Sequence, residues 1–109
     1  MVRKGNTQKG KQSLTIATGA ITAPVGHQFL TVDTEASGAT DDLDTISGGD
    51  IGDIVTFAAV NDARTVVFKD GTGNLDLNGD FSADNGNDTI TLLRNGTGWQ
   101  EVCRSNNAA

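Results

Sequence analysis

One pattern occurs twice in the second half of the chain, and it constrains the fold more than any other feature. The first copy reads Thr65-Val-Val-Phe-Lys-Asp-Gly-Thr-Gly-Asn-Leu-Asp-Leu77, and the second, twenty-five positions later, reads Ile90-Thr-Leu-Leu-Arg-Asn-Gly-Thr-Gly-Trp-Gln-Glu-Val102. Each copy has an apolar strand ending on a cation, a turn, and a second strand. Asp-Gly and Asn-Gly favour hairpin turns because these residues tolerate positive φ. The sequence therefore predicts an all-β protein of repeated antiparallel hairpins.

Apolar and polar residues alternate elsewhere with the period of β-strands, and no window has the spacing of a helix. We expect strands at residues 13–18, 27–33, 43–47, 53–59, 64–69, 74–78, 88–94 and 99–104. The segments between them read as connections or polar loops, the longest at 19–26, 34–42 and 79–87. The expected fold is an antiparallel, hairpin-rich sandwich or roll, or a prism-like β domain. This domain spans 13–104, between an extended N-terminal arm at 1–12 and a tail at 105–109.

Large apolar side chains are scarce. The 109 residues include four Phe, one Trp and no Tyr, against 14 Gly. Small domains with little core are commonly completed by disulfides, metal ions or other subunits. Cys103 and His27 are each the only residue of their type, so an internal disulfide and a His/Cys metal site are not expected. Association of several copies is the remaining way to complete the core.

Charge is distributed unevenly along the chain. Four cations and no acid lie in residues 1–32, whereas residues 33–101 hold all fourteen acids against three cations. A basic arm ahead of an acidic body favours an arm that docks on an acidic surface, and an ordinary N-terminal extension is the alternative. Nucleic acid is not an expected partner, because four cations cannot outweigh such an acidic body. No apolar segment is long enough for a membrane span or a secretory signal, so we expect a protein made in a cytoplasm.

No arrangement of residues in the sequence predicts an enzyme. Nothing distinguishes one carboxylate as a general acid, and His27 has no nucleophile in a recognisable motif. The Gly/Asp-rich stretches at 48–53 and 84–88 are similar to calcium-binding loops, but their spacing departs from the known repeats. Turn formation explains them, with a single calcium ion at a subunit contact left open. We expect no cofactor.

Trp99 directly follows the second turn. A lone aromatic residue beside a loop can stack on a sugar, and it can equally anchor a core or a subunit interface. The sequence favours the second interpretation.

The part of the chain from about residue 43 to 107 resembles a β module of tailed-bacteriophage structural proteins, found in head-decoration and head-fibre proteins and at tail-fibre tips. The resemblance is carried by Asp44-Thr-Ile-Ser-Gly-Gly49, Gly52-Asp-Ile-Val-Thr-Phe57, Arg64-Thr-Val-Val-Phe-Lys-Asp-Gly-Thr-Gly-Asn74, Leu77-Asn-Gly-Asp-Phe81, Asp88-Thr-Ile-Thr-Leu92, Gly98-Trp-Gln-Glu101 and Arg104-Ser-Asn-Asn107. It implies a homotrimer with a structural or adhesive role, and places the protein on the exterior of a virion capsid.

Two functions follow from this resemblance. In the first, the protein is a capsid decoration (cement) or head-fibre protein that binds the major capsid protein and stabilises the assembled shell. In the second, it is a receptor-binding tip of a tail fibre or tailspike that contacts a host glycan or protein. The sequence favours the first, because the chain has few aromatic residues and no fibre shaft.

The residues expected to act in these roles fall into two groups. The expected capsid contacts are Arg3, Lys4, Lys9, Lys11, Leu14 and Ile16. The strand at 13–18 is expected to add to a sheet edge of the capsid or to exchange between protomers. The expected core of the trimer consists of Val55, Phe57, Val67, Phe68, Leu92 and Trp99.

Overall fold

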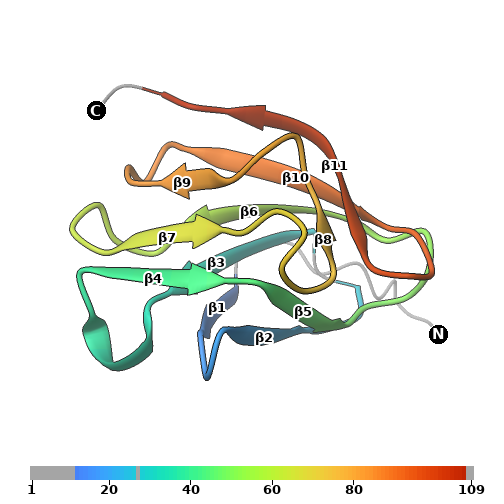
Figure 1. Ribbon diagram of the computed structural model, residues 1–109, viewed down its shortest axis with the longest axis horizontal. Coiled ribbons are helices and arrows are strands. Elements are labelled where there is room, and N and C mark those ends of the chain that lie inside the picture. Colours follow the sequence, from blue (N-terminus) through green and yellow to red (C-terminus); the bar gives the residue numbers. More distant parts are fainter. Residues whose placement is uncertain (1–11, 27, 108–109) are drawn as a thin grey trace, which may run out of the picture.

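The computed structural model describes residues 12–26 and 28–107, and these form an all-β structure, as predicted (Figure 1). The only helical element among them is one 3-10 turn, η1 (Glu35–Ser37). The strands are β1 (Gln12–Thr15), β2 (Ala20–Ala23), β3 (Phe29–Asp33), β4 (Thr40–Leu43), β5 (Thr45–Gly48), β6 (Ile54–Ala59), β7 (Thr65–Phe68), β8 (Leu75–Asp76), β9 (Phe81–Ala83), β10 (Thr89–Arg94) and β11 (Trp99–Ser105).

The strands form three sheets. The largest has the order β1-β3-β6-β10-β11-β8, and two smaller ones have the orders β4-β7-β9 and β2-β5. Figure 1 shows β4, β7 and β9 lying in front of the large sheet. The aromatic ring of Phe57 on β6 meets that of Phe68 on β7 edge-on, with centroids 6.0 Å apart. The core therefore lies between these two layers.

The first two-thirds of the chain winds as a coil of parallel strands. β3 pairs with β6 with Leu30 opposite Phe57, β4 pairs with β7 with Thr40 opposite Thr65, and all these strands run parallel. β2 and β5 pair in the same way. Parallel neighbours need a long crossover connection. Here the connection from β3 to β6 passes through β4 and β5, one strand in each of the other two sheets, as in one turn of a solenoid fold.

This coil corrects the prediction of an antiparallel, hairpin-rich fold. Residues 90–102 do form the predicted hairpin, since β10 and β11 pair antiparallel. Residues 65–77 do not, because β7 pairs with β4 on one side and with β9 on the other. Both edges of β7 are occupied, so the chain after the first turn crosses to the edge of the large sheet, where β8 runs parallel to β11.

Three strands lie in segments that the sequence assigned to connections and loops: β2, β4 and β9. They are short, and few of their side chains are apolar and inward-facing, namely Ile21, Ala23, Leu43, Phe81 and Ala83. The C-terminal boundary also moves. Ser105 belongs to β11, and the backbone N–H of Asn107 donates to the buried Asp88 carboxylate at 2.7 Å. Ser105 and Asn107, which the sequence assigned to the tail, therefore contact the β domain.

A single chain encloses the core. Trp99 is 0% exposed, and its ring meets that of Phe57 edge-on at 6.1 Å. The indole Nε1 donates to the Ile46 carbonyl at 3.2 Å. A buried indole needs such an acceptor, and the core interpretation of Trp99 is thereby confirmed.

Candidate functional site

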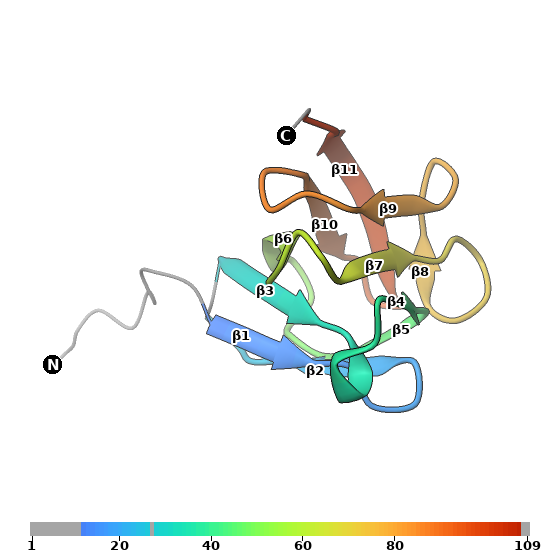
Figure 2. The same ribbon diagram turned by 90° about the vertical axis from the view of Figure 1, so that its left-hand side faces the viewer.

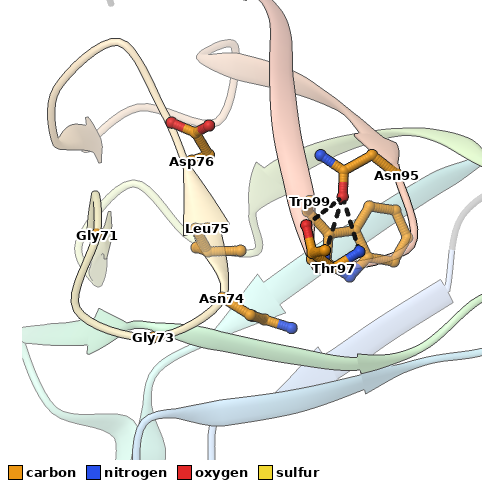
Figure 3. A pocket seen from close by; sticks show the side chains of 9 residues that line it. Gly71, Gly73, Asn74, Leu75, Asp76, Asn95, Thr97 and Trp99 are labelled. Carbon is orange, nitrogen blue, oxygen red and sulfur yellow. Dashed lines mark hydrogen bonds between the residues drawn. The ribbon is translucent and has the colours of Figure 1, made fainter.

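The two Gly-Thr-Gly turns meet at one surface groove. β8 follows the first turn and β11 follows the second, and the two strands pair with Leu75 opposite Trp99. The backbone N–H of Trp99 donates to the Asn74 carbonyl at 2.9 Å. The groove between the turns has a volume of about 290 Å³ and is lined by Gly71, Gly73, Asn74, Leu75, Asp76, Asn95, Thr97, Gly98 and Trp99 (Figure 3). The two copies of the sequence repeat thus lie next to each other in the structure.

Each turn is held by the side chain at its first position. Oδ1 of Asn95 accepts hydrogen bonds from the N–H and hydroxyl groups of Thr97, both at 3.1 Å, and from the Gly98 N–H at 3.0 Å (Figure 3). Asp70 occupies the equivalent position, and its Oδ1 accepts from the Leu77 N–H at 2.8 Å. The Asn95 oxygen is therefore occupied by its own turn, and the Asp70 oxygen holds the backbone just after β8. Turn formation therefore accounts for the Asp and Asn of the repeat.

The second glycine of each turn is required by a close backbone approach. A Cβ at Gly73 would overlap the Asp44 carbonyl, and one at Gly98 would overlap the Asn74 carbonyl. The first glycines, Gly71 and Gly96, have positive φ and open space around the Cβ position or only an ordinary contact. The two glycines of the motif therefore have different roles, and these roles are the same in both copies.

The side chain of Asn74, which lines the groove, forms two hydrogen bonds with the backbone of Ile46 on β5. Its Oδ1 accepts from the Ile46 N–H at 2.9 Å, and its Nδ2 donates to the Ile46 carbonyl at 2.7 Å. These are the two bonds that a neighbouring strand would make. No pattern in the sequence distinguishes Asn74 from the other turn residues, and sequence reasoning gave it no such role.

The groove continues along β8 and β11 into a second hollow of about 420 Å³, lined by Asp76, Leu77, Asn78, Gln100, Glu101 and Val102. Asp76 and Gln100 lie opposite each other where the two hollows meet. Among the described residues, no hydrogen bond or ion pair engages the Asp76 carboxylate. Carboxylate and amide groups on neighbouring strands can bind the hydroxyl groups of a polar ligand.

Arg104 holds two residues beside this groove, Glu101 and Gly79. Its guanidinium pairs with Glu101, with 2.8 Å between Nη2 and Oε1, and donates to the Gly79 carbonyl at 2.7 Å. The guanidinium carbon lies 5.1 Å from the centre of the Phe81 ring. The hydrogen bond from Arg104 holds the pKa of Glu101 below its usual range, against the opposing effect of burial. Arg104 is thus a structural cation that fixes the loop between β8 and β9.

A second feature is the free edge of β1, the first strand of the large sheet. Figure 2 shows β1 between β3 and the start of β2, which follows after a tight turn. Among the described residues, β1 pairs along its length only with β3, and one isolated antiparallel bridge, between Ala17 and Ala20, joins the chain just after β1 to β2. The N–H of Ile16 donates to the Asp33 carbonyl on β3 at 3.0 Å. Because successive N–H groups of a strand point to opposite sides, that of Thr15 points away from β3. β1 carries no charged residue, whereas the edge strand β4 carries Asp41 and Asp42, and charges discourage edge pairing.

The structure corrects part of the expected capsid contacts. Ile16 is buried in the core, so its side chain is not displayed to a partner, whereas Leu14 is half-buried against the same core. Arg3, Lys4, Lys9 and Lys11 lie outside the described residues.

The expected trimer core is also corrected. Five of its six residues, Val55, Phe57, Phe68, Leu92 and Trp99, are buried inside one chain and need no partner for their burial. Val67 alone is half-buried, on the outer side of β7. The homotrimer itself stays a prediction.

No protein-family model, curated protein or solved structure matches this chain. Within residues 12–26 and 28–107, no helix has the length and apolar character needed to cross a membrane. Over the same residues, no three side chains of His, Cys, Asp or Glu are grouped so that they could hold a metal ion.

Proposed function

We propose that this chain is a structural protein of a bacteriophage virion, a capsid decoration (cement) or head-fibre protein that binds the assembled shell as a homotrimer. The observation that carries the proposal is the uncharged edge strand β1, whose side away from β3 pairs along β1 with no other strand of the described residues. β1 directly follows the basic segment 1–11. An exposed edge strand can extend the sheet of another protein through backbone hydrogen bonds. The basic residues supply attraction to an acidic shell, and the edge supplies a defined orientation.

Shell stabilisation then follows from mass action. A protein that binds the assembled lattice and not its free subunits shifts the equilibrium toward the lattice. Three linked copies raise the effective concentration of each contact once the first has formed, so modest individual contacts suffice.

Proline substitution at the β1 edge tests the proposed contact. Thr15→Pro removes an outward N–H and leaves the bonds between β1 and β3 in place. The matched control is Thr22→Pro, on β2. Thr22 is exposed. The carbonyl of the next residue, Ala23, accepts from the Gly49 N–H and so points toward β5. Because the polar backbone groups of successive residues point to opposite sides, the N–H of Thr22 points away from β5.

Binding to purified, undecorated capsids of the encoding phage should fall at least tenfold for Thr15→Pro and stay unchanged for Thr22→Pro. Circular dichroism and thermal unfolding establish that both variants are folded. Unchanged binding of a folded Thr15→Pro variant would exclude the β1 edge as the contact.

The second candidate is a receptor-binding tip, and the groove between the two turns is the observation that favours it. Asp76, Gln100 and Thr97 place a carboxylate, an amide and a hydroxyl at one surface, as sites for saccharide hydroxyl groups do. Against this candidate, the Trp99 ring beside the groove is fully buried and cannot stack on a sugar. A glycan array with the wild type and Asp76→Ala distinguishes the candidates, since a hit that Asp76→Ala abolishes supports the tip and no hit supports the shell protein.

A further inference from the structure

The outer face of β6, β10 and β11 has an unusual composition for this chain. Alternation along the strands directs ten side chains away from the core: Ile54, Thr56, Ala58, Thr89, Thr91, Leu93, Gln100, Val102, Cys103 and Ser105. Nine of them are exposed or half-buried, and Ala58 is buried. None of them is charged, in a protein with 22 charged residues and a net charge of −6. We call these ten residues the neutral face. The solvent side of an ordinary antiparallel pair carries polar and charged residues instead.

Large apolar side chains are displayed at two ends of this neutral face. Ile54 is 55% exposed and Val102 is 54% exposed. Leu93 lies between them in register, opposite Ile54 on β6 and Gln100 on β11. A β-bulge beside Leu92 places Val102 as the extra residue of β11, which raises its exposure. Apolar side chains displayed on one face of a sheet are typical of a protein interface.

Two of the four hydroxyl groups of the neutral face are paired with each other. The side-chain oxygens of Thr56 and Thr91, on neighbouring strands, are hydrogen-bonded at 2.8 Å. A hydroxyl that keeps a partner on its own chain loses less on leaving water than an unpaired one. The centre of the face can therefore be covered by another surface at low cost.

We infer that copies of this chain associate through the neutral face. The inference rests on the homotrimer of the proposed function and names the surface that would form it. The net charge of −6 indicates which partner covers the neutral face. A basic partner would be attracted to the acidic loops, whereas two acidic copies repel each other everywhere except where the contact surface carries no charge. A second copy offers a neutral face of the same kind.

Charge insertion tests this surface. Ile54→Arg and Val102→Arg each place a cation in the neutral face at a side chain that is more than half exposed, so folding is expected to survive. Ile51→Arg is the matched control, because Ile51 is 76% exposed but lies in the loop before β6. Sedimentation velocity from micromolar to millimolar concentration measures the association of the wild type and the three variants.

The wild type should form an oligomer whose association weakens at least tenfold in Ile54→Arg and Val102→Arg, and less than twofold in Ile51→Arg. Cys103 gives an independent readout, since its thiol is exposed on the neutral face of a single chain. Its reaction with a maleimide should slow as the wild-type concentration rises, and stay constant for Ile54→Arg.

A wild type that is monomeric at every concentration would overturn the inference, as would equal effects of all three variants. Capsid binding measured on the same samples separates this result from the proposed function. Monomeric chains that still bind capsids contradict only the neutral-face association. Oligomers that bind no capsid contradict only the shell-binding role.

Discussion

The side chain of Asn74 pairs with the backbone of Ile46 as a neighbouring strand would, accepting from its N–H at 2.9 Å and donating to its carbonyl at 2.7 Å. This contact joins the first turn of the sequence repeat to β5 of the previous circuit. The Trp99 indole donates to the same carbonyl. One buried backbone position therefore connects the coil, the repeat and the aromatic core.

Replacing Asn74 should destabilise the whole fold. Asn74→Ala leaves the N–H of the buried Ile46 without its acceptor, and we expect the free energy of unfolding to fall by about 1–3 kcal/mol. Urea unfolding monitored by Trp99 fluorescence measures this loss. Asn106→Ala is the control, because Asn106 is exposed and should change stability by less than about 0.5 kcal/mol. Equal stabilities of the two variants would contradict the structural role of Asn74.

The two glycines of one turn should respond differently to alanine. Gly73→Ala forces a methyl group against the Asp44 carbonyl, and we expect a loss of about 3 kcal/mol, near the upper end for overpacking. Gly71→Ala introduces only the strain of a positive φ, 78°, for about 1 kcal/mol. Thermal unfolding of both variants gives the order. The reverse order would mean that β5 and the first turn are not in contact.

Acid should weaken the fold through two carboxylates. Hydrogen bonds from Arg64 and Arg104 lower the pKa of Asp33 and Glu101 below their ordinary values of 3.8 and 4.5. Because both pKa values are depressed in the folded state, the stability they add is complete above the ordinary values. It is lost as the pH falls through the folded-state values.

Urea unfolding between about pH 6 and pH 2 measures this dependence. The double variant Asp33→Asn/Glu101→Gln should be less stable at neutral pH and lose less stability on acidification than the wild type. Parallel pH profiles of the two proteins would contradict the assignment.

The sequence was informative about strands and less so about their partners. β6, β7 and β10 were predictable because β-branched and aromatic residues alternate along them. The short strands β4 and β9 were not, because polar or acidic residues surround a few inward side chains such as Leu43 and Phe81. Which strands pair depends on residues far apart in the sequence. The same Gly-Thr-Gly turn joins the two strands of a hairpin before β11, whereas before β8 it carries the chain from the β4-β7-β9 sheet to the large sheet.

The candidate site shows the same limit. The repeated turns were visible in the sequence, but their meeting at one groove depends on the parallel pairing of β8 with β11. The neutral face was equally hidden, because its ten residues come from three strands, and only the register of those strands brings them together. Burial of Phe57, Phe68 and Trp99 in one chain also could not be read from composition, since small residues such as Ala59 and Ala83 complete the core.

Co-sedimentation with assembled and unassembled capsid protein tests the proposed function most directly. Wild-type protein is mixed with intact undecorated capsids of the encoding phage, and separately with an equal mass of unassembled major capsid protein. The account predicts saturable binding to intact capsids, higher thermal resistance of the decorated shells, and no binding to free subunits. Equal binding to both forms, or no binding to intact capsids, would contradict it.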